Sequence, residues 1–587
     1  MKRIAIWSAL LLLCLSLFSR PCHGEEQVLL KAMRDELRRS MEQLQLDKEA
    51  SPYFLSYLVK DWSLLSVAAD SGAITEDDGM RWRMLKTDLR VGDCQVDNTH
   101  FDAGMSYGRT NPQSEVVIDD NYGVLRRQLW METDRLYKAA LEQLTKKRAW
   151  LRNMIHAKTV PDFTKGEAFT EVKAPMDLAI TDREQGRELV RTVAQQLTGN
   201  GKLRKSSVYF GERRENVYYV NSDGAESVEP RKSCWLTICA ETRADDGMPL
   251  KNFVQYKAAD LSGLPGRERI KEDVAAMLRD LMALRTAPLA ENFSGPVLFE
   301  GQAAAEMMAR GFIKALAAKR VSESADSDEG EAAGRENPLQ SKVGARVIGG
   351  SATIVDEVTK NAWKGIPLLG SYLVDEEGIK AKNMVLVEKG IMKNLLMSRS
   401  PVEGFSGSNG HFRGISAAPA VVSVSSDKAV PAGDLKKRLM AQLKEDNLKY
   451  GYLVKSILPP NLSTGDKGSQ SGALPSEFEL ASPVLVYRVY PDGKEELIRG
   501  AEFGRMSVRL FKDILALGND PVVYNYPISR YKAPVDYIFP DRTDPAGGTF
   551  ATVITPSLLF SEVDLNRPSG KYARPPLVPH PAAGPSH

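Results

Sequence analysis

The histidine and serines of one glycine-rich loop are the residues most suggestive of catalysis. His411 follows Ser406 and Ser408 within residues 404–411 (GFSGSNGH), where a serine nucleophile and a histidine base would suit hydrolysis. The loop lacks the G-x-S-x-G sequence and the strand, turn and helix order that expose such a serine. A lone histidine in a loop of this kind more often hydrogen-bonds within a turn. We therefore keep His411 as a binding candidate and predict no catalytic residue here.

Arg413, two residues further along, suggests recognition of a carboxylate. A guanidinium can hold a carboxylate through two parallel hydrogen bonds, and glycines let a ligand approach the backbone closely. Arg413 could clamp a peptide carboxylate in a cleft lined by Gly407, Asn409 and Gly410. It could equally anchor its own loop, which is the simpler interpretation.

Two glutamates border the other candidate segment. Pro296–Phe299 predicts a short strand that leads into residues 300–306 (EGQAAAE), with Glu300 and Glu306 at the two ends. Their carboxylates could bind a hard cation such as calcium. A glutamate at a helix N-terminus is also favoured by the helix dipole, and the run of alanines favours a packed helix. The helix start is the preferred interpretation, with both glutamates kept as binding candidates.

These candidates lie among predicted turns and strands. Asp375–Gly378 (DEEG) predicts a turn. Met384–Val387 and Ile391–Met397 are apolar runs on either side of Glu388–Gly390, which predicts a buried hairpin. The glycine-rich loop follows this hairpin directly.

This succession of blocks resembles the TldD/PmbA family of metalloprotease-related proteins. The resemblance rests on the DEEG turn, the hairpin, the glycine-rich loop and a C-terminal pair of blocks: a helix end at residues 517–520 (LGND) and a strand led by residues 556–559 (PSLL). A tyrosine-rich strand leading into residues 221–224 (NSDG) adds to it. The match covers most of residues 295–565. It implies an α+β fold of two domains, an N-terminal mixed α/β domain and a C-terminal, mostly antiparallel β domain with flanking helices.

The resemblance also indicates where a metal site would lie. Family members with peptidase activity carry a His-Glu-x-x-x-His motif after a short strand, in which the imidazoles bind a metal and the glutamate acts as base. On the matching positions, Glu300 and Ala305 replace the histidines and Gly301 replaces the glutamate. No cysteine follows Cys239. The histidines of the mature chain are widely scattered: His100, His156, His411, His580 and His587. We therefore expect no metal ligands and no cofactor, with zinc confined to members that keep the motif.

Helical periodicity organises the rest of the chain. Apolar spacing predicts helices over Glu25–Leu46, Tyr122–Trp150 and Ile270–Ala287. Pro288 and the Gly295–Pro296 pair then predict the hinge between the halves. The predicted divisions are a signal peptide (1–24), an N-terminal α+β domain (25–290), a TldD/PmbA-like domain (291–566) and a proline-rich tail (567–587).

The first residues predict export. Lys2 and Arg3 precede an apolar run, Ile4–Phe18, that is too short for a stable bilayer anchor. Cys22 and Gly24 then supply the small residues that suit cleavage after Gly24. We expect a periplasmic or extracellular protein with no transmembrane anchor in the mature chain.

Composition and cysteines exclude some classes of protein. Lysine and arginine (78) nearly balance aspartate and glutamate (76), so no overall field favours nucleic acid as a partner. Cys94, Cys234 and Cys239 remain after cleavage, which allows at most one intramolecular disulfide. Cys234 and Cys239 share a strand-like run, and five strand steps of ~3.3 Å separate their α-carbons by about 16 Å, beyond disulfide reach.

These observations favour an exported, metalloprotease-like protein of the TldD/PmbA type that lacks the metal-binding motif. The resemblance implies a non-catalytic peptide-binding or partner subunit, like the PmbA-type (TldE) half of the family's paired proteins. Its partner would be a peptide or protein, within a homodimer or a heterodimer with a family paralogue. The alternative is an active peptidase with a non-standard site at Glu300, Glu306 or His411, and a purely structural role in the cell envelope is a third hypothesis.

Overall fold

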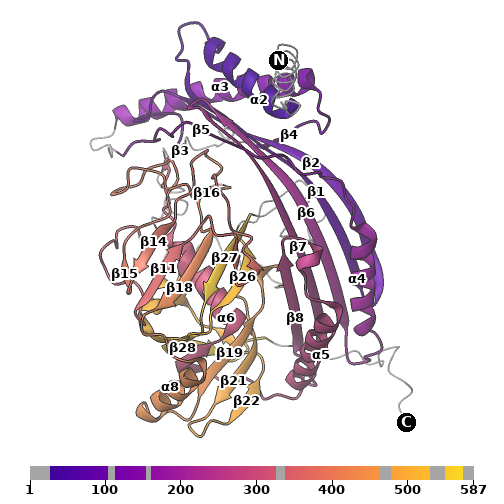
Figure 1. Ribbon diagram of the computed structural model, residues 1–587. Coiled ribbons are helices and arrows are strands. Elements are labelled where there is room, and N and C mark those ends of the chain that lie inside the picture. The colour runs from indigo at the N-terminus through magenta and orange to yellow at the C-terminus, as the bar shows by residue number, and fades with distance from the viewer. Residues whose placement is uncertain are drawn as a thin grey trace, which may run out of the picture.

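The computed structural model describes residues 27–102, 113–153, 160–324, 337–414, 416–462, 477–528, 549–570 and 572. The predicted signal peptide and most of the predicted tail lie outside these residues. The fold is α+β, as predicted: a long curved sheet from the N-terminal half carries helices on one side and the C-terminal half on the other (Figure 1). The division at residue 290 stays a prediction.

The N-terminal sheet has seven strands in the order β4-β2-β1-β6-β7-β5, with β8 paired to the far part of β7. Four of its strands are 17 to 19 residues long. Only β5 pairs in parallel. The strands are β1 (Pro52–Asp70), β2 (Ala73–Val91), β4 (Gln113–Glu115), β5 (Phe169–Val172), β6 (Lys205–Asn221), β7 (Ala225–Arg243) and β8 (Pro249–Ala258).

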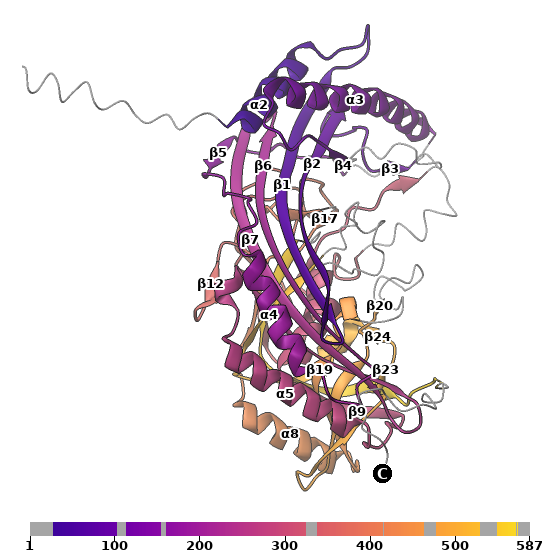
Figure 2. The same cartoon turned by 90° about the vertical axis from the view of Figure 1, so that its right-hand side faces the viewer.

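Helices cover one face of this sheet, and the C-terminal half covers the other (Figure 2). Odd-numbered residues of β1, such as Tyr57 and Val67, pack under the helices. Even-numbered residues face the other way, and Trp62 and Leu64 pack with Phe550 of the C-terminal half, as the period of two in a strand requires. The helices are α2 (Val28–Gln43), α3 (Tyr122–Arg152), α4 (Arg183–Gln196) and α5 (Arg267–Leu284).

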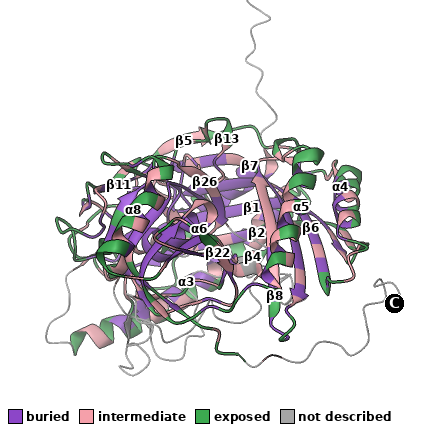
Figure 3. Cartoon of the chain, turned by 90° about the horizontal axis from the view of Figure 1, so that it is seen from below, coloured by how far each residue is buried: buried purple, intermediate pink, exposed green. Residues whose placement is uncertain are grey.

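The C-terminal half holds two larger sheets with α6 between them. The six-stranded sheet has the order β15-β14-β11-β18-β27-β26, and the seven-stranded sheet has the order β22-β21-β19-β9-β28-β23, with β25 on β28. Most pairs are antiparallel; β18–β27 and β19–β9 are parallel. The α8 helix packs on the outer face of the second sheet and shows exposed surface in Figure 3.

The elements of this half have the following bounds: β9 (Phe293–Phe299), α6 (Gly301–Glu306), β11 (Ala352–Asp356), β14 (Met384–Glu388), β15 (Ile391–Met392), β18 (Val421–Ser426), α8 (Ala432–Glu445), β19 (Gly451–Ile457), β21 (Pro483–Val489), β22 (Glu495–Ile498), β23 (Glu502–Phe503), β25 (Ile514–Leu517), β26 (Val522–Pro527), β27 (Phe550–Thr555) and β28 (Leu558–Asn566). Short two-stranded pairs join β3 (Phe101–Asp102) to β10 (Glu323–Ser324), β12 (Ala362–Trp363) to β13 (Ile366–Pro367), β16 (Phe412–Arg413) to β17 (Ser416–Ala417), and β20 (Glu477–Phe478) to β24 (Met506–Ser507).

Three local predictions were wrong. Residues 517–520 do not end a helix, because the residues that lead into them, Ile514–Leu517, form strand β25 and pair with β28. The second strand of the predicted hairpin ends at Met392: further on, Leu396 exchanges backbone hydrogen bonds with Leu316 and Ala318 instead of with β14. Gly295 and Pro296 lie inside β9 and not in a hinge.

The remaining expectations concern membranes and disulfides. Of the helices in the described ranges, none combines the length and apolar composition that a bilayer span requires. Cys94, Cys234 and Cys239 are free thiols. Cys234 and Cys239 lie on one strand, β7, as predicted.

Candidate functional site

Residues 300–306, which the sequence resemblance matches to the family's metal-binding motif, form a packed helix start. β9 leads directly into α6, where Ala303, Ala304 and Ala305 have no exposed surface. Glu300 precedes the helix with an extended backbone, and Glu306 is the last residue of the helix. Within the described residues, no group of three or more histidine, cysteine, aspartate or glutamate side chains could hold a metal ion.

Glu300 and Glu306 have separate surroundings. Burial raises the pKa of Glu300, and Asp520 adds to the rise while Lys455 opposes it. Glu306 is almost fully buried and accepts hydrogen bonds from the hydroxyl of Tyr524 and, at 3.3 Å, from Nε of Arg310. Each carboxylate is therefore held by its own set of neighbours.

Lys257, a residue of the N-terminal sheet, lies close enough to Glu306 for the two charges to interact. This β8 residue places Nζ 5.1 Å from the centre of the Tyr524 ring. Burial lowers the pKa of Lys257 to about 8; Glu306 opposes the shift and Arg310 adds to it. No sequence pattern indicated Lys257 or Tyr524, since their approach depends on how the two halves pack.

His411 is a buried residue with structural contacts. Its Nδ1 lies 2.9 Å from Oδ1 of Asn409, and its Nε2 lies 3.6 Å from a carboxylate oxygen of Asp356. Burial lowers the pKa of His411, with Asp356 opposing the shift. Asn409 in turn accepts from the backbone N–H of Met397 at 2.7 Å. Gly407 lies on the exposed part of the loop, so the loop does not gather these residues around one ligand position.

Arg413 lines a cavity, but not with the neighbours expected from the sequence. The cavity has a volume of about 50 Å³ and lies between the N-terminal sheet and the C-terminal half, where Arg413 meets Lys60, Arg213 and Arg231. The guanidinium of Arg413 donates to the carbonyl oxygen of Phe550 at 2.7 Å. The described residues that line the cavity do not include Gly407, Asn409 or Gly410.

A second cavity of about 200 Å³ lies on the other side of the Asp375–Gly378 turn. It is lined by β1 and β2 residues on one side and by Glu376, Ser400 and Phe412 on the other. Glu376 accepts from Nζ of Lys60 at 2.6 Å. Burial raises the pKa of Glu376, but Lys60 and Lys86 outweigh that effect and hold it at about 2. The Lys60–Glu376 ion pair thus links β1 to the turn between the two cavities.

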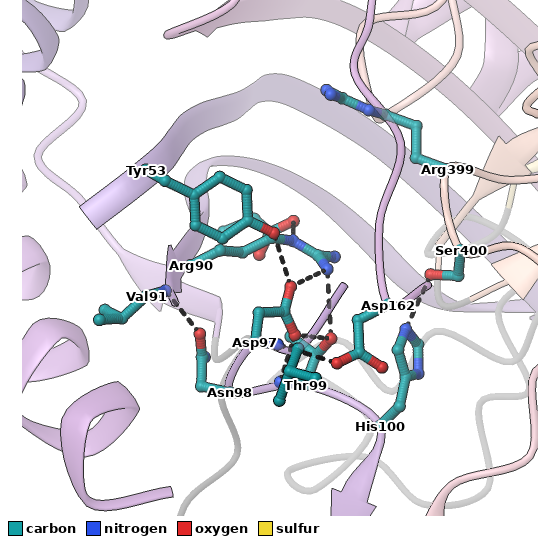
Figure 4. Close-up of polar contacts among 12 residues, drawn as sticks. Tyr53, Arg90, Val91, Asp97, Asn98, Thr99, His100, Asp162, Arg399 and Ser400 are labelled. Carbon is teal, nitrogen blue, oxygen red and sulfur yellow. Dashed lines mark hydrogen bonds and ion pairs between the residues drawn. The ribbon is translucent and has the colours of Figure 1, made fainter. Parts of the chain in front are cut away.

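Ser400 and His100 meet in this second cavity (Figure 4). The serine Oγ lies 3.0 Å from Nε2 of His100. Burial lowers the pKa of His100 to about 3, with Arg90 adding to the shift. A general base works best with a pKa near the working pH, and a triad needs an acid to orient its histidine; no hydrogen bond described for this part of the chain joins His100 to Asp97 or Asp162. The pair is a poor nucleophile and base.

Two neighbouring carboxyl groups of the turn are buried, and the pKa of each is raised. Burial raises the pKa of Asp375 to about 8, and the neighbouring Glu377 adds to the rise. The pKa of Glu377 is also raised by burial. Asp375 accepts from the backbone N–H groups of Ile379 and Phe412 at 2.9 and 3.0 Å, and Glu377 accepts from the N–H of Arg399 at 2.6 Å. These bonds fix the turn against the strand that carries Arg413.

Comparison with known sequences finds a family match in the C-terminal half. Residues 293–567 match the model of the PmbA/TldA metallopeptidase C-terminal domain. An Archaeoglobus fulgidus protein named metalloprotease is 24% identical over 251 residues, which are 43% of this chain and 53% of that protein. The match therefore spans about half the length of this curated relative.

Two solved structures share the fold across most of the chain. TldE from Thermococcus kodakarensis superposes with a TM-score of 0.57 at 14% identity, covering 91% of this chain and 100% of that one. A Thermotoga maritima protein named as a candidate modulator of a DNA gyrase superposes with a TM-score of 0.55 at 13% identity, covering 87% of this chain and 96% of that one. Identities this low show a common fold alone.

Proposed function

This chain belongs to the TldD/PmbA family, and from that premise we propose that it is a non-catalytic subunit that binds a peptide or a protein partner. The proposal is supported by the sequence resemblance, which matches Glu300, Gly301 and Ala305 to the positions where the family's peptidases need two imidazoles and a general base. Ala305 is fully buried in the core. This donor set does not suit zinc, which prefers nitrogen and sulfur ligands.

The proposed partner is a peptide or a second family chain. The fold shared with a TldE structure supports an assembly with a paralogue, and a homodimer is the other arrangement we propose. Each of the two cavities is lined by residues of both halves of the molecule, so a chain bound there would contact both halves.

Export is part of the proposal and rests on the charged, apolar and small-residue order of Lys2–Gly24. We expect the mature protein to begin at Glu25 and to reside in the periplasm or outside the cell. Mass spectrometry of the N-terminus of protein isolated from its native host tests this. A cytoplasmic protein that retains Met1 would refute it.

The alternative, a peptidase with a non-standard site, makes a different prediction for Glu300. If Glu300 only begins α6, Glu300→Gln should leave peptide binding unchanged, and incubated peptides should be recovered intact from both proteins. Mass spectrometry of the peptide mixture provides the readout. Cleavage by the wild type that is lost in Glu300→Gln would favour the enzyme and contradict the binding role.

A further inference from the structure

The small cavity that contains Arg413 is walled mainly by cationic side chains. β1, β6 and β7 supply one wall, and the C-terminal half supplies the other; Figure 1 shows these strands facing the six-stranded sheet. Five lining side chains are lysine or arginine, and one is a carboxylate. The lining residues are Lys60, Arg213, Glu215, Arg231, Lys232, Ser233, Leu369, Ser371, Arg413, Thr549 and Phe550.

Four of these cations pair with carboxylates, whereas the ion pairs of the described residues include none for Arg413. The pairs are Lys60–Glu376, Arg213–Glu215, Arg231–Glu229 and Lys232–Asp260. For Arg413, the described contacts are the carbonyl oxygens of Pro419 and Phe550 and the face of the Tyr372 ring, 4.6 Å from the guanidinium carbon. The cavity therefore holds one positive charge without a described carboxylate partner.

Several guanidinium nitrogens at this site also lack a hydrogen-bond partner. Nε and Nη1 of Arg213 and Nε of Arg231 are buried and unpaired in the described structure. Arg213 is only 7% exposed, and its guanidinium stacks on Trp62 at 4.4 Å. Leaving a charged donor buried and unpaired is costly, and an acceptor in the cavity would remove that cost.

We propose that this cavity binds a single oxyanion group, held by Arg213, Arg231 and Arg413. Its volume of about 50 Å³ is far below the roughly 300–1,000 Å³ of pockets that enclose whole ligands, so only a head group enters. Guanidinium groups suit such a group because they form paired, charge-assisted hydrogen bonds. Lys232, whose side chain is 46% exposed, gives the cavity a border with solvent.

The anion has two candidate sources, and the preferred one is the C-terminal carboxylate of a peptide. The choice of a peptide as the source rests on the proposed peptide-binding function, whereas the proposal of an anion site does not. The other source is a free inorganic anion such as phosphate. The two share the chemistry that the arginines recognise, so binding measurements must separate them.

The test uses the full mature chain and calorimetric titration with three probes: inorganic phosphate, a short peptide with a free C-terminus and the same peptide amidated. Binding of the free peptide over the amidated one supports the site and the peptide as source. Binding of phosphate alone supports the site and contradicts the peptide-binding function. Failure of all three probes at millimolar concentration refutes the site.

Two neighbouring arginines on β6 provide a matched pair of variants. Arg213→Met should weaken binding by about tenfold or more, the order expected for losing charge-assisted hydrogen bonds. Arg214 points to the opposite face, where it pairs with Glu212 and Asp182, so Arg214→Met should bind like the wild type. Arg413→Lys, which keeps the charge but loses the planar fork, should also bind more weakly. Melting temperatures confirm folding, and unchanged affinity in folded Arg213→Met would overturn the assignment.

Discussion

Replacing Arg399 by alanine is expected to lower the free energy of unfolding by about 3–5 kcal/mol, the loss typical of breaking a buried ion pair. Arg399 belongs to the C-terminal half and has no exposed surface. Its guanidinium pairs with Asp223 in the β6–β7 turn, donates through Nε to the carbonyl oxygen of Thr164 at 2.8 Å, and stacks on Phe163 at 4.0 Å. Its removal leaves the Asp223 carboxylate largely buried without its cation.

Urea unfolding followed by tryptophan fluorescence measures this change. Arg135 is the control, because its ion pair with Glu132 lies on the exposed side of α3. Arg135→Ala should cost about 0.2–0.5 kcal/mol, as surface helix pairs do. Equal effects of the two substitutions would show that Arg399 does not hold the halves together.

The second large effect is a dependence of stability on pH between pH 5 and pH 8. The pKa of Asp375 is raised by burial and by Glu377, from an ordinary value of 3.8 to about 8. The folded state therefore binds a proton more tightly than the unfolded chain. Its contribution to stability is complete below pH 4 and is lost as the pH rises towards 8. Glu376, whose pKa is lowered to about 2, contributes stability that is complete in this window and is lost only as the pH falls below it.

Glu377→Gln isolates this effect. The variant removes the neighbouring negative charge and keeps an oxygen that can accept from the N–H of Arg399. From pH 5 to pH 8, the wild type should lose more unfolding free energy than the variant, by at least about 1.4 kcal/mol, the equivalent of one pKa unit. Glu388→Gln, at the exposed last position of β14, should follow the wild type. Parallel curves for the wild type and Glu377→Gln would contradict the effect of Glu377 on the pKa of Asp375.

Local sequence patterns predicted the helices whose apolar residues recur with helical spacing and the hairpins whose turns need particular residues. The apolar spacing of α3 and α5 and the NSDG turn between β6 and β7 are visible in the sequence, because one face of each helix is exposed and because tight turns need particular residues. β1 lacks such a signal. Helices bury one of its faces and the C-terminal half buries the other, so polar residues do not alternate with apolar ones.

The candidate site depends on contacts that no local pattern encodes. Arg413 attracted notice because it follows a glycine-rich loop, but Arg213 and Arg231 lie on strands nearly two hundred residues earlier. Only the register of β6 against β7, which places Arg213 opposite Ser233, and the packing of the C-terminal half bring them together. The same holds for Lys60 and the Asp375–Gly378 turn. In the sequence their charged residues are typical of a solvent-exposed turn, whereas in the structure the carboxylates of the turn are buried.

The zinc content of the purified mature protein tests the central claim most directly. Elemental analysis after extensive dialysis should find far less than one zinc per chain, because Glu300, Gly301 and Ala305 offer neither imidazole nor thiolate. A TldD/PmbA relative that keeps the His-Glu-x-x-x-His motif, purified in parallel, should retain its metal and so validate the procedure. One tightly held zinc per chain would contradict the account, since the ligands would then come from residues that it leaves without a metal-binding role.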